Sequence, residues 1–289
     1  MGTNYADQIP VVNRTYKDTL FRMIFREKRN LLQLYNALNS TNYTEEADLE
    51  IVTLENAIYM NMKNDVAFLL ADRLNLYEHQ STYNPNMPLR DLFYICREYE
   101  KLVGQESLYS STKIQIPNPR FVVFYNGIDW QEEDQTLKLS DLYLHQEEDP
   151  ELELKVRMLN INEGYNKATV EQCKLLHEYT QYVDKVRKYS ENKPIQEAVK
   201  LAVTESIKQG ILSNFLTKYR QEAIQMSIFE YDEEKEMRLL RQAERQGYAE
   251  ESIRNLMETM KLSLSQAMDA LKIPAEDRSM YAARIQRQQ

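Results

Sequence analysis

The stretch Asn64–Gln80, NDVAFLLADRLNLYEHQ, decides the fold that the sequence predicts. It holds two apolar segments, Asp65–Leu70 and Leu74–Gln80, with only Ala71-Asp72-Arg73 between them. Short apolar segments joined by so few residues are typical of two antiparallel strands and a tight turn. A two-residue turn at Ala71-Asp72 would place residue 70 opposite residue 73 and residue 65 opposite residue 78. The stretch therefore predicts a β-hairpin.

In this register the carboxylates of Asp65 and Glu78 face each other. Directly opposed residues share a face of the sheet, with Cβ atoms about 4.5–5.5 Å apart. A turn moved by one residue would oppose Asp65 to His79 or Gln80 instead, whereas Glu78 and Gln80 share a face in any register. Two carboxylates held this close repel each other unless a cation lies between them, and Mg²⁺ prefers such oxygen ligands and keeps waters. The hairpin is a candidate Mg²⁺ or Mn²⁺ site; the alternative is a solvated acidic edge.

The segments around the hairpin predict a mixed α/β domain. The apolar spacing predicts helices over 15–39 and 88–103, and a further pair over 166–190 and 194–209 that ends at Gly210. Phe121–Tyr125 is apolar on both faces, which is typical of a buried central strand. Further strands are expected at 56–62, 137–144 and 151–160.

The C-terminal part of the chain reads as helical throughout. A long amphipathic stretch over 211–245 is followed by two short predicted helices, 249–261 and 263–272. Residues 1–209 are therefore expected to form the α/β domain and residues 210–289 a helical region. The apolar faces within 211–245 are wider than one exposed helix needs, so they should dock on the rest of the chain or on a second copy.

Composition limits the class of protein. Of the 289 residues, 43% are apolar, yet no stretch approaches the roughly 20 apolar residues that cross a bilayer, and the first residues do not resemble a signal peptide. We therefore expect a cytoplasmic protein without a membrane partner, with two reduced cysteines. The net charge is −9, and much of it comes from the acidic stretch 131–155. This charge disfavours a protein that coats nucleic acid along its whole surface.

Basic residues gather elsewhere. Arg22, Arg26 and Arg29 follow helical spacing, so one helix would carry all three on one face. Such a face is either a solvated surface or a strip that binds DNA phosphates. Arg90 and Arg97 are seven residues apart on the second predicted helix, where they either face a phosphate or are solvated. Asp18, near the start of the first helix, either adds a carboxylate to the site or interacts with the helix dipole.

Several segments together resemble one family of nucleases. Asp65 followed after 13 residues by Glu78-His79-Gln80 is similar to the D…E-x-K signature of the PD-(D/E)XK superfamily, with Asn64 in place of the usual Pro and Gln80 in place of the usual Lys. The E-x-Q variant occurs in the branch of Rpn-type recombination-promoting nucleases, also described as putative transposases. The other segments that resemble this branch are KDTLF (17–21), LENAIYM (54–60), YNPNMPLR (83–90) and FVVFYNG (121–127).

The resemblance covers roughly residues 15–235 and implies a restriction-endonuclease-like core, a mixed sheet flanked by helices, with an all-helical C-terminal tail. It implies an Mg²⁺-dependent DNA endonuclease, linked to recombination, mobile elements or defence against foreign DNA. Asp65 and Glu78 would be metal ligands and Gln80 the third site residue. A Gln can hydrogen-bond a water but brings no charge, so the alternative is a weakly active or inactive nuclease fold that binds DNA or protein.

Overall fold

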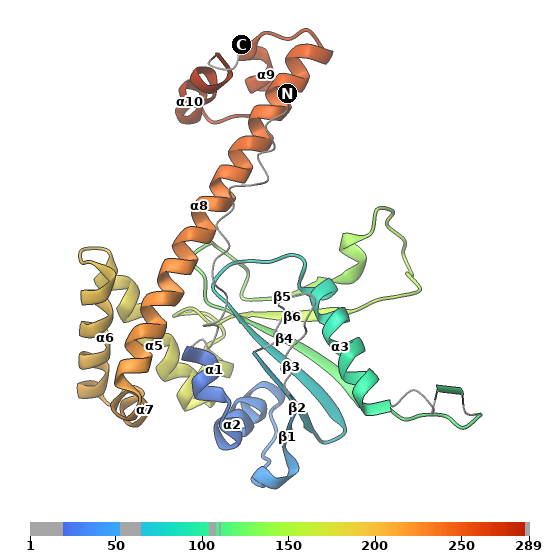
Figure 1. Ribbon diagram of the computed structural model, residues 1–289, viewed down its shortest axis with the longest axis vertical. Coiled ribbons are helices and arrows are strands. Elements are labelled where there is room, and N and C mark those ends of the chain that lie inside the picture. The colour runs from blue at the N-terminus through green and yellow to red at the C-terminus, as the bar shows by residue number, and fades with distance from the viewer. Residues whose placement is uncertain (1–19, 53–64, 104–107, 110, 287–289) are drawn as a thin grey trace, which may run out of the picture. The chain divides into compact units, whose positions relative to one another are not determined.

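The computed structural model describes residues 20–52, 65–103, 108–109 and 111–286 (Figure 1). The chain divides into two compact units, Met1–Glu230 and Tyr231–Gln289, which are described separately. Asp18 and the strand expected at 56–62 lie outside the described residues.

The first unit is built on a mixed open sheet, so the α/β class is confirmed. Its order is β1-β2-β3-β4-β6-β5, in which β3, β4 and β6 are parallel and the remaining pairs are antiparallel. The strands are β1 (Glu50–Ile51), β2 (Val66–Leu70), β3 (Arg73–Gln80), β4 (Asn118–Tyr125), β5 (Asp134–Lys138) and β6 (Lys155–Asn160). The buried central strand expected at Phe121–Tyr125 is the second half of β4.

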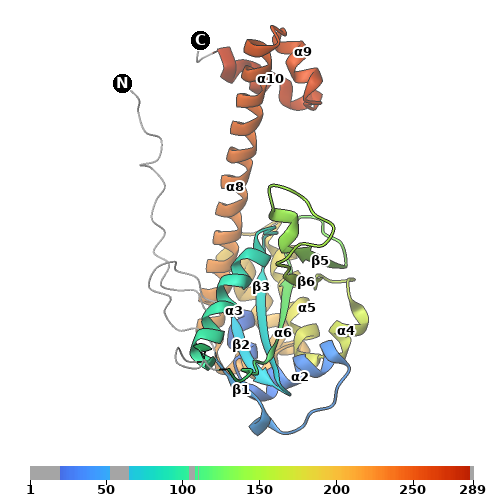
Figure 2. The ribbon, with the colours of Figure 1, turned by 90° about the vertical axis from the view of Figure 1, so that its right-hand side faces the viewer.

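Helices cover both faces of this sheet, as Figures 1 and 2 show. One face carries α3 (Met87–Val103), which connects the parallel strands β3 and β4. The other face carries α1 (Leu20–Phe25), α2 (Lys28–Asn39), α4 (Lys167–Gln172), α5 (Lys174–Ser190) and α6 (Ile195–Gln209). Side chains along β3 alternate between these two faces. Leu74 and Leu76 belong to the core beneath α3, and Tyr77 belongs to the core on the opposite face.

The first predicted helix is interrupted. Its apolar positions are buried as expected, but the chain turns at Arg26-Glu27 between α1 and α2 instead of continuing through. The Asn30 side chain donates to the carbonyl oxygen of Ile24 (2.8 Å), which satisfies one of the backbone acceptors at the end of α1. The prediction of one continuous helix was therefore wrong at this point.

Two predicted strands have different bounds. The segment expected as a strand over 137–144 is the end of β5 followed by a 3₁₀ turn, η4 (Leu139–Leu142). The segment expected over 151–160 becomes a strand only at Lys155, and Leu152, taken as part of its alternation, is 51% exposed. A second 3₁₀ turn, η2 (Glu46–Asp48), precedes β1.

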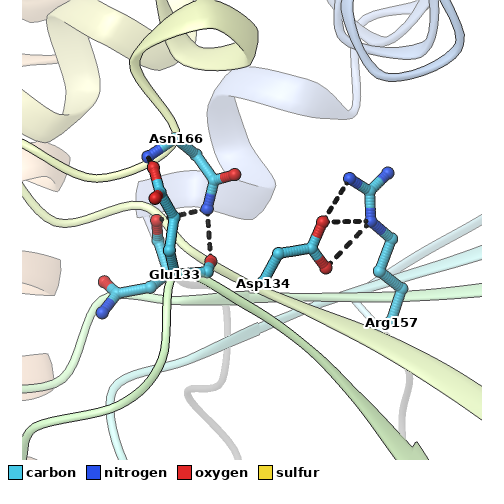
Figure 3. A network of polar contacts seen from close by, with 5 residues as sticks. Glu133, Asp134, Arg157 and Asn166 are labelled. Atoms are coloured by element: carbon cyan, nitrogen blue, oxygen red, sulfur yellow. Dashed lines mark hydrogen bonds and ion pairs between the residues drawn. The ribbon is translucent and has the colours of Figure 1, made fainter.

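A polar network joins the start of β5 to its surroundings (Figure 3). The Arg157 guanidinium makes a bidentate ion pair with Asp134, with a shortest N–O distance of 2.6 Å. One residue earlier, the carboxylate of Glu133 accepts from the backbone N–H of Asn166 (2.5 Å), and its carbonyl oxygen accepts from the Asn166 side chain. These contacts tie the start of β5 to β6, and the end of the loop after β4 to the segment that precedes α4.

The first unit extends beyond Gly210. Gly210 ends α6 in the left-handed conformation (φ 79°), as the sequence predicted. The chain then continues through α7 (Ser213–Lys218) into α8 (Arg220–Thr259), and Leu212, Leu216 and Ala223 are buried in the core of the first unit. The compact unit therefore ends after Glu230, about 20 residues beyond the boundary expected from the sequence.

In its described residues the second unit consists of helices and short connections, without a strand. The last turns of α8 pack with α9 (Leu264–Ala270) and α10 (Ala275–Gln286) around a small core of Ile253, Ala267, Met268, Tyr281 and Ile285. Ser263 and Gln266 form a capping box at the start of α9. The short helix expected over 249–261 is the end of α8, and α10 was not predicted from the sequence.

Candidate metal site on the acidic hairpin

The hairpin between β2 and β3 has the predicted register. Leu70 pairs with Arg73 and Val66 with Tyr77, so the next pair outward is Asp65 and Glu78. The turn residues Ala71 (φ 51°) and Asp72 (φ 58°) both lie in the left-handed region, which is the geometry of a type I′ turn. Because this two-residue loop fixes the register, the carboxylates of residues 65 and 78 come from directly opposed positions.

Both carboxylates belong to the face of the sheet that α3 covers. On β3, Glu78 and Gln80 continue the alternation of Leu74 and Leu76, whereas His79 points to the opposite face. The Asp65 carboxylate accepts a hydrogen bond from the backbone N–H of His79 (2.6 Å), which holds it beside β3. Register and alternation thus assign the positions of Asp65, Glu78 and Gln80 to one face of the sheet.

Glu78 is the most constrained group of this site. It is 3% exposed, and its Oε1 has no hydrogen-bond partner among the described residues. Burial, together with the neighbouring Asp65 carboxylate, holds the pKa of Glu78 well above its usual range, against the opposing effects of Arg90 and Arg22. A buried carboxylate with an unsatisfied oxygen and a second carboxylate beside it is an arrangement that a cation would stabilise.

The start of α3 supplies a cation to the same place. Arg90 Nη2 lies 3.9 Å from Glu78 Oε2 and also donates to the hydroxyl of Tyr94 (3.1 Å). With the Gln80 amide oriented to satisfy both of its neighbours, Gln80 accepts from Arg90 Nη1 (3.1 Å) and donates to the Thr82 carbonyl (3.2 Å). Arg90 therefore contacts two of the three predicted site residues.

A further carboxyl at this site, Asp91, was not predicted from the sequence. It is 1% exposed, and its Oδ1 has no partner within the described part of the chain. Burial raises the pKa of Asp91 to about 8, opposed by Arg90, and Asp91 in turn raises the pKa of Glu78. Helical periodicity in the sequence could have indicated that Asp91 is buried. Residues 87, 91, 94, 95 and 98 follow helical spacing and share the buried side of α3.

The other predicted arginines are not gathered on one helical face. Arg22 lies on α1 and lowers the pKa of Glu78, so it acts on the site through its charge. Arg26 and Arg29 are exposed; Arg26 lies in the interruption itself and Arg29 in the first turn of α2, which corrects the expectation of a single strip. Arg97 lies on α3 and is half-buried, and its Nη1 has no hydrogen-bond partner among the described residues.

The donor set fits a hard divalent cation with few protein ligands. Among the described residues, no three His, Cys, Asp or Glu side chains gather as a ligand group, so the candidate set is the carboxylate pair of Asp65 and Glu78. Mg²⁺ is commonly held by one or two carboxylates and otherwise by water and substrate oxygens. The unsatisfied Oε1 of Glu78 is an available ligand atom in this pair.

No family model matches this chain, and searches of curated proteins and of solved structures returned no match. Across the ranges that the structure describes, no helix combines the length and apolar character required to span a membrane.

Proposed function

We propose that this protein is an Mg²⁺-dependent DNA endonuclease of the PD-(D/E)XK type, acting in recombination, mobile-element movement or defence against foreign DNA. The observation that supports it best is the opposition of Asp65 and Glu78, one of which is buried with an unsatisfied oxygen. A solvated acidic edge, the simplest alternative for the hairpin, would leave both carboxylates hydrated. Glu78 is instead 3% exposed.

Asp65 and Glu78 would hold the metal, which when bound supplies a water of lowered pKa and stabilises developing negative charge. Gln80 would orient this water through its amide, which donates and accepts hydrogen bonds but does not act as a base near neutral pH. Arg90 would supply the positive charge that a Lys at position 80 would bring. Its guanidinium already contacts Gln80 and lies near Glu78.

The test is incubation of supercoiled plasmid with the full chain in Mg²⁺ and in EDTA. Nicked or linear product in Mg²⁺ alone supports the endonuclease. DNA binding without cleavage in either buffer would favour the second candidate, a nuclease fold that serves as a binding module. The absence of a charge at position 80 is the observation that favours this candidate.

If Arg90 supplies the positive charge of the site, a positive charge at position 80 should partly replace it. Arg90→Gln is expected to lower the rate of nicking by about 100-fold, the usual effect of removing a group that stabilises transition-state charge. Adding Gln80→Lys to that variant should recover part of the loss, because the new ammonium lies where Arg90 contacts residue 80. Arg120→Gln, at an exposed position of β4, is the control and should nick at the wild-type rate. Equal losses in the single and double variants would contradict this role for Arg90.

DNA affinity is expected to depend on the exposed arginines near the α1–α2 junction. The double variant Arg26→Gln/Arg29→Gln should bind a DNA duplex more weakly and reduce the dependence of binding on salt, by a log–log slope of about 0.9 for each lost phosphate contact. Fluorescence anisotropy at several salt concentrations measures this slope. A slope equal to that of the wild type would place the DNA on another surface.

We also propose that the C-terminal region contributes to self-association. In the second unit, Leu239 (57%), Leu240 (51%) and Tyr248 (72%) are exposed apolar side chains on α8. Truncation at Gly210 is an unsuitable test because Leu212 and Leu216 belong to the core of the first unit. Light scattering should instead find a dimer of the wild type and a monomer of Leu239→Glu/Leu240→Glu. A monomeric wild type would exclude this role.

A further inference from the structure

A chain of polar contacts, buried at Tyr179 and Asn126, lies behind the candidate site on the opposite face of the sheet. His79 stands between Glu78 and Gln80, and its ring points away from them, stacked on Phe21 with ring centres 5.0 Å apart and an interplanar angle of 18°. The ring atom Nε2 lies 2.9 Å from the hydroxyl of Tyr179, whose ring meets the imidazole edge-on at 84°. Two aromatic groups and one hydrogen bond therefore fix this imidazole.

The phenol of Tyr179 joins the imidazole to a second side chain. Tyr179 is fully buried on α5, and its oxygen accepts a hydrogen bond from the side-chain amide of Asn126 (3.2 Å). The phenol oxygen therefore contacts both the Asn126 amide and the His79 ring.

Asn126 connects the same chain to the next residue of β3. Its backbone N–H donates to the carbonyl oxygen of Gln80 (3.0 Å), while its own carbonyl oxygen accepts from Arg187 of α5. The following residue, Gly127, packs so closely that a Cβ there would lie 2.3 Å from the Ser81 carbonyl oxygen. The loop after β4 is thus held directly against the end of β3.

We infer that Tyr179 and Asn126 are positioning residues of the candidate site. Together they fix the side chain of His79 and the backbone of Gln80. The His79 backbone N–H in turn holds the Asp65 carboxylate at 2.6 Å. The spacing between the Asp65 and Glu78 carboxylates therefore depends on a hydroxyl on α5. The effect of this inference on the rate of nicking rests on the proposed function.

The test compares two tyrosines of the same helix. Tyr179→Phe removes the hydroxyl that contacts His79. Tyr182→Phe removes an equally buried hydroxyl, which bonds to Ser227 Oγ (2.7 Å) and lies outside the His79 and Asn126 contacts. Tyr179→Phe loses the hydrogen bonds to His79 and Asn126, and Tyr182→Phe loses the hydrogen bond to Ser227. Tyr182→Phe therefore controls for the loss of a buried tyrosine hydroxyl from the same helix. Only Tyr179→Phe should change the site.

The first readout needs no activity. The chain has three histidines, so selective ¹⁵N-histidine labelling gives three amide signals and three imidazoles. In Tyr179→Phe the His79 imidazole signals should move because the contact between Nε2 and the phenol is lost, and the His79 amide signal should move as its bond to Asp65 changes. Tyr182→Phe should leave both signals in place. Unchanged His79 signals in Tyr179→Phe would overturn the inference.

The second readout is kinetic. Tyr179→Phe should lower kcat for Mg²⁺-dependent nicking by about tenfold to 100-fold, the range found when a group supporting a metal ligand is removed. The KM for DNA and the rate of Tyr182→Phe should stay near the wild-type values. Equal rates for the two variants would overturn the inference. A wild type inactive in Mg²⁺ would instead overturn the proposed function, and the nuclear magnetic resonance signals alone would then decide the positioning role.

Discussion

Glu78→Gln and Asp65→Asn are each expected to abolish Mg²⁺-dependent nicking. Removing a group that only supports a metal ligand costs about 10–100-fold, so removing a ligand should cost more than roughly 100-fold. Both substitutions keep the shape of the side chain, and in Asp65→Asn the new amide oxygen can still accept from the His79 backbone N–H. The loss should therefore come from charge and not from misfolding. Initial rates of plasmid nicking measure it.

The same two variants should be at least as stable as the wild type without metal. Each removes one of two repelling carboxylates, and Glu78→Gln also removes a buried ionisable group whose pKa is held well above its usual range. Thermal unfolding in EDTA measures this effect. Activity near the wild-type level in either variant, or an unfolded variant, would contradict the assignment of the site.

Asp91→Asn is expected to change how stability depends on pH. Burial raises the pKa of Asp91 from its usual 3.8 to about 8. Between these pH values the folded state keeps a proton on Asp91 that the unfolded state releases. The contribution of Asp91 to the free energy of unfolding is therefore complete below about pH 4 and is lost as the pH rises towards 8. The slope is at most about 1.4 kcal/mol per pH unit. From pH 5 to pH 8, the wild type should therefore lose up to roughly 4 kcal/mol relative to Asp91→Asn.

Denaturant unfolding of both proteins at pH 5 and pH 8 gives this difference directly. Asp141→Asn, at an exposed position of η4, is the control and should follow the wild type at both values. A stability difference between Asp91→Asn and the wild type that is the same at pH 5 and pH 8 would show that Asp91 does not retain its proton on folding.

The sequence predicted the hairpin well because a tight turn is a local structure. Ala71-Asp72 leaves few registers for two short strands, so spacing predicted the opposition of Asp65 and Glu78 for one turn position and His79 or Gln80 for the next. The pairing of the structure selects the first of these. The strand Phe121–Tyr125 and the helix end at Gly210 were predictable for similar reasons, since apolar content and a glycine act over a few residues. The α/β class followed from the order of these elements.

The remaining features depend on tertiary contacts. The interruption at Arg26-Glu27 separates arginines that helical spacing had placed together, and no breaking residue marks it in the sequence. The burial of Asp91 follows from the way α3 lies on the sheet, and the contact between Tyr179 and His79 joins residues 100 positions apart. Spacing within the sequence carries no information about such distant pairs.

The most direct test of the central claim is plasmid nicking by the wild type, Asp65→Asn and Asp72→Asn, with and without Mg²⁺. Asp72 lies in the turn of the same hairpin, exposed and in the left-handed conformation, which Asn also tolerates. The proposed site predicts nicking by the wild type and Asp72→Asn in Mg²⁺ only, and none by Asp65→Asn. Nicking by Asp65→Asn at the wild-type rate would contradict it.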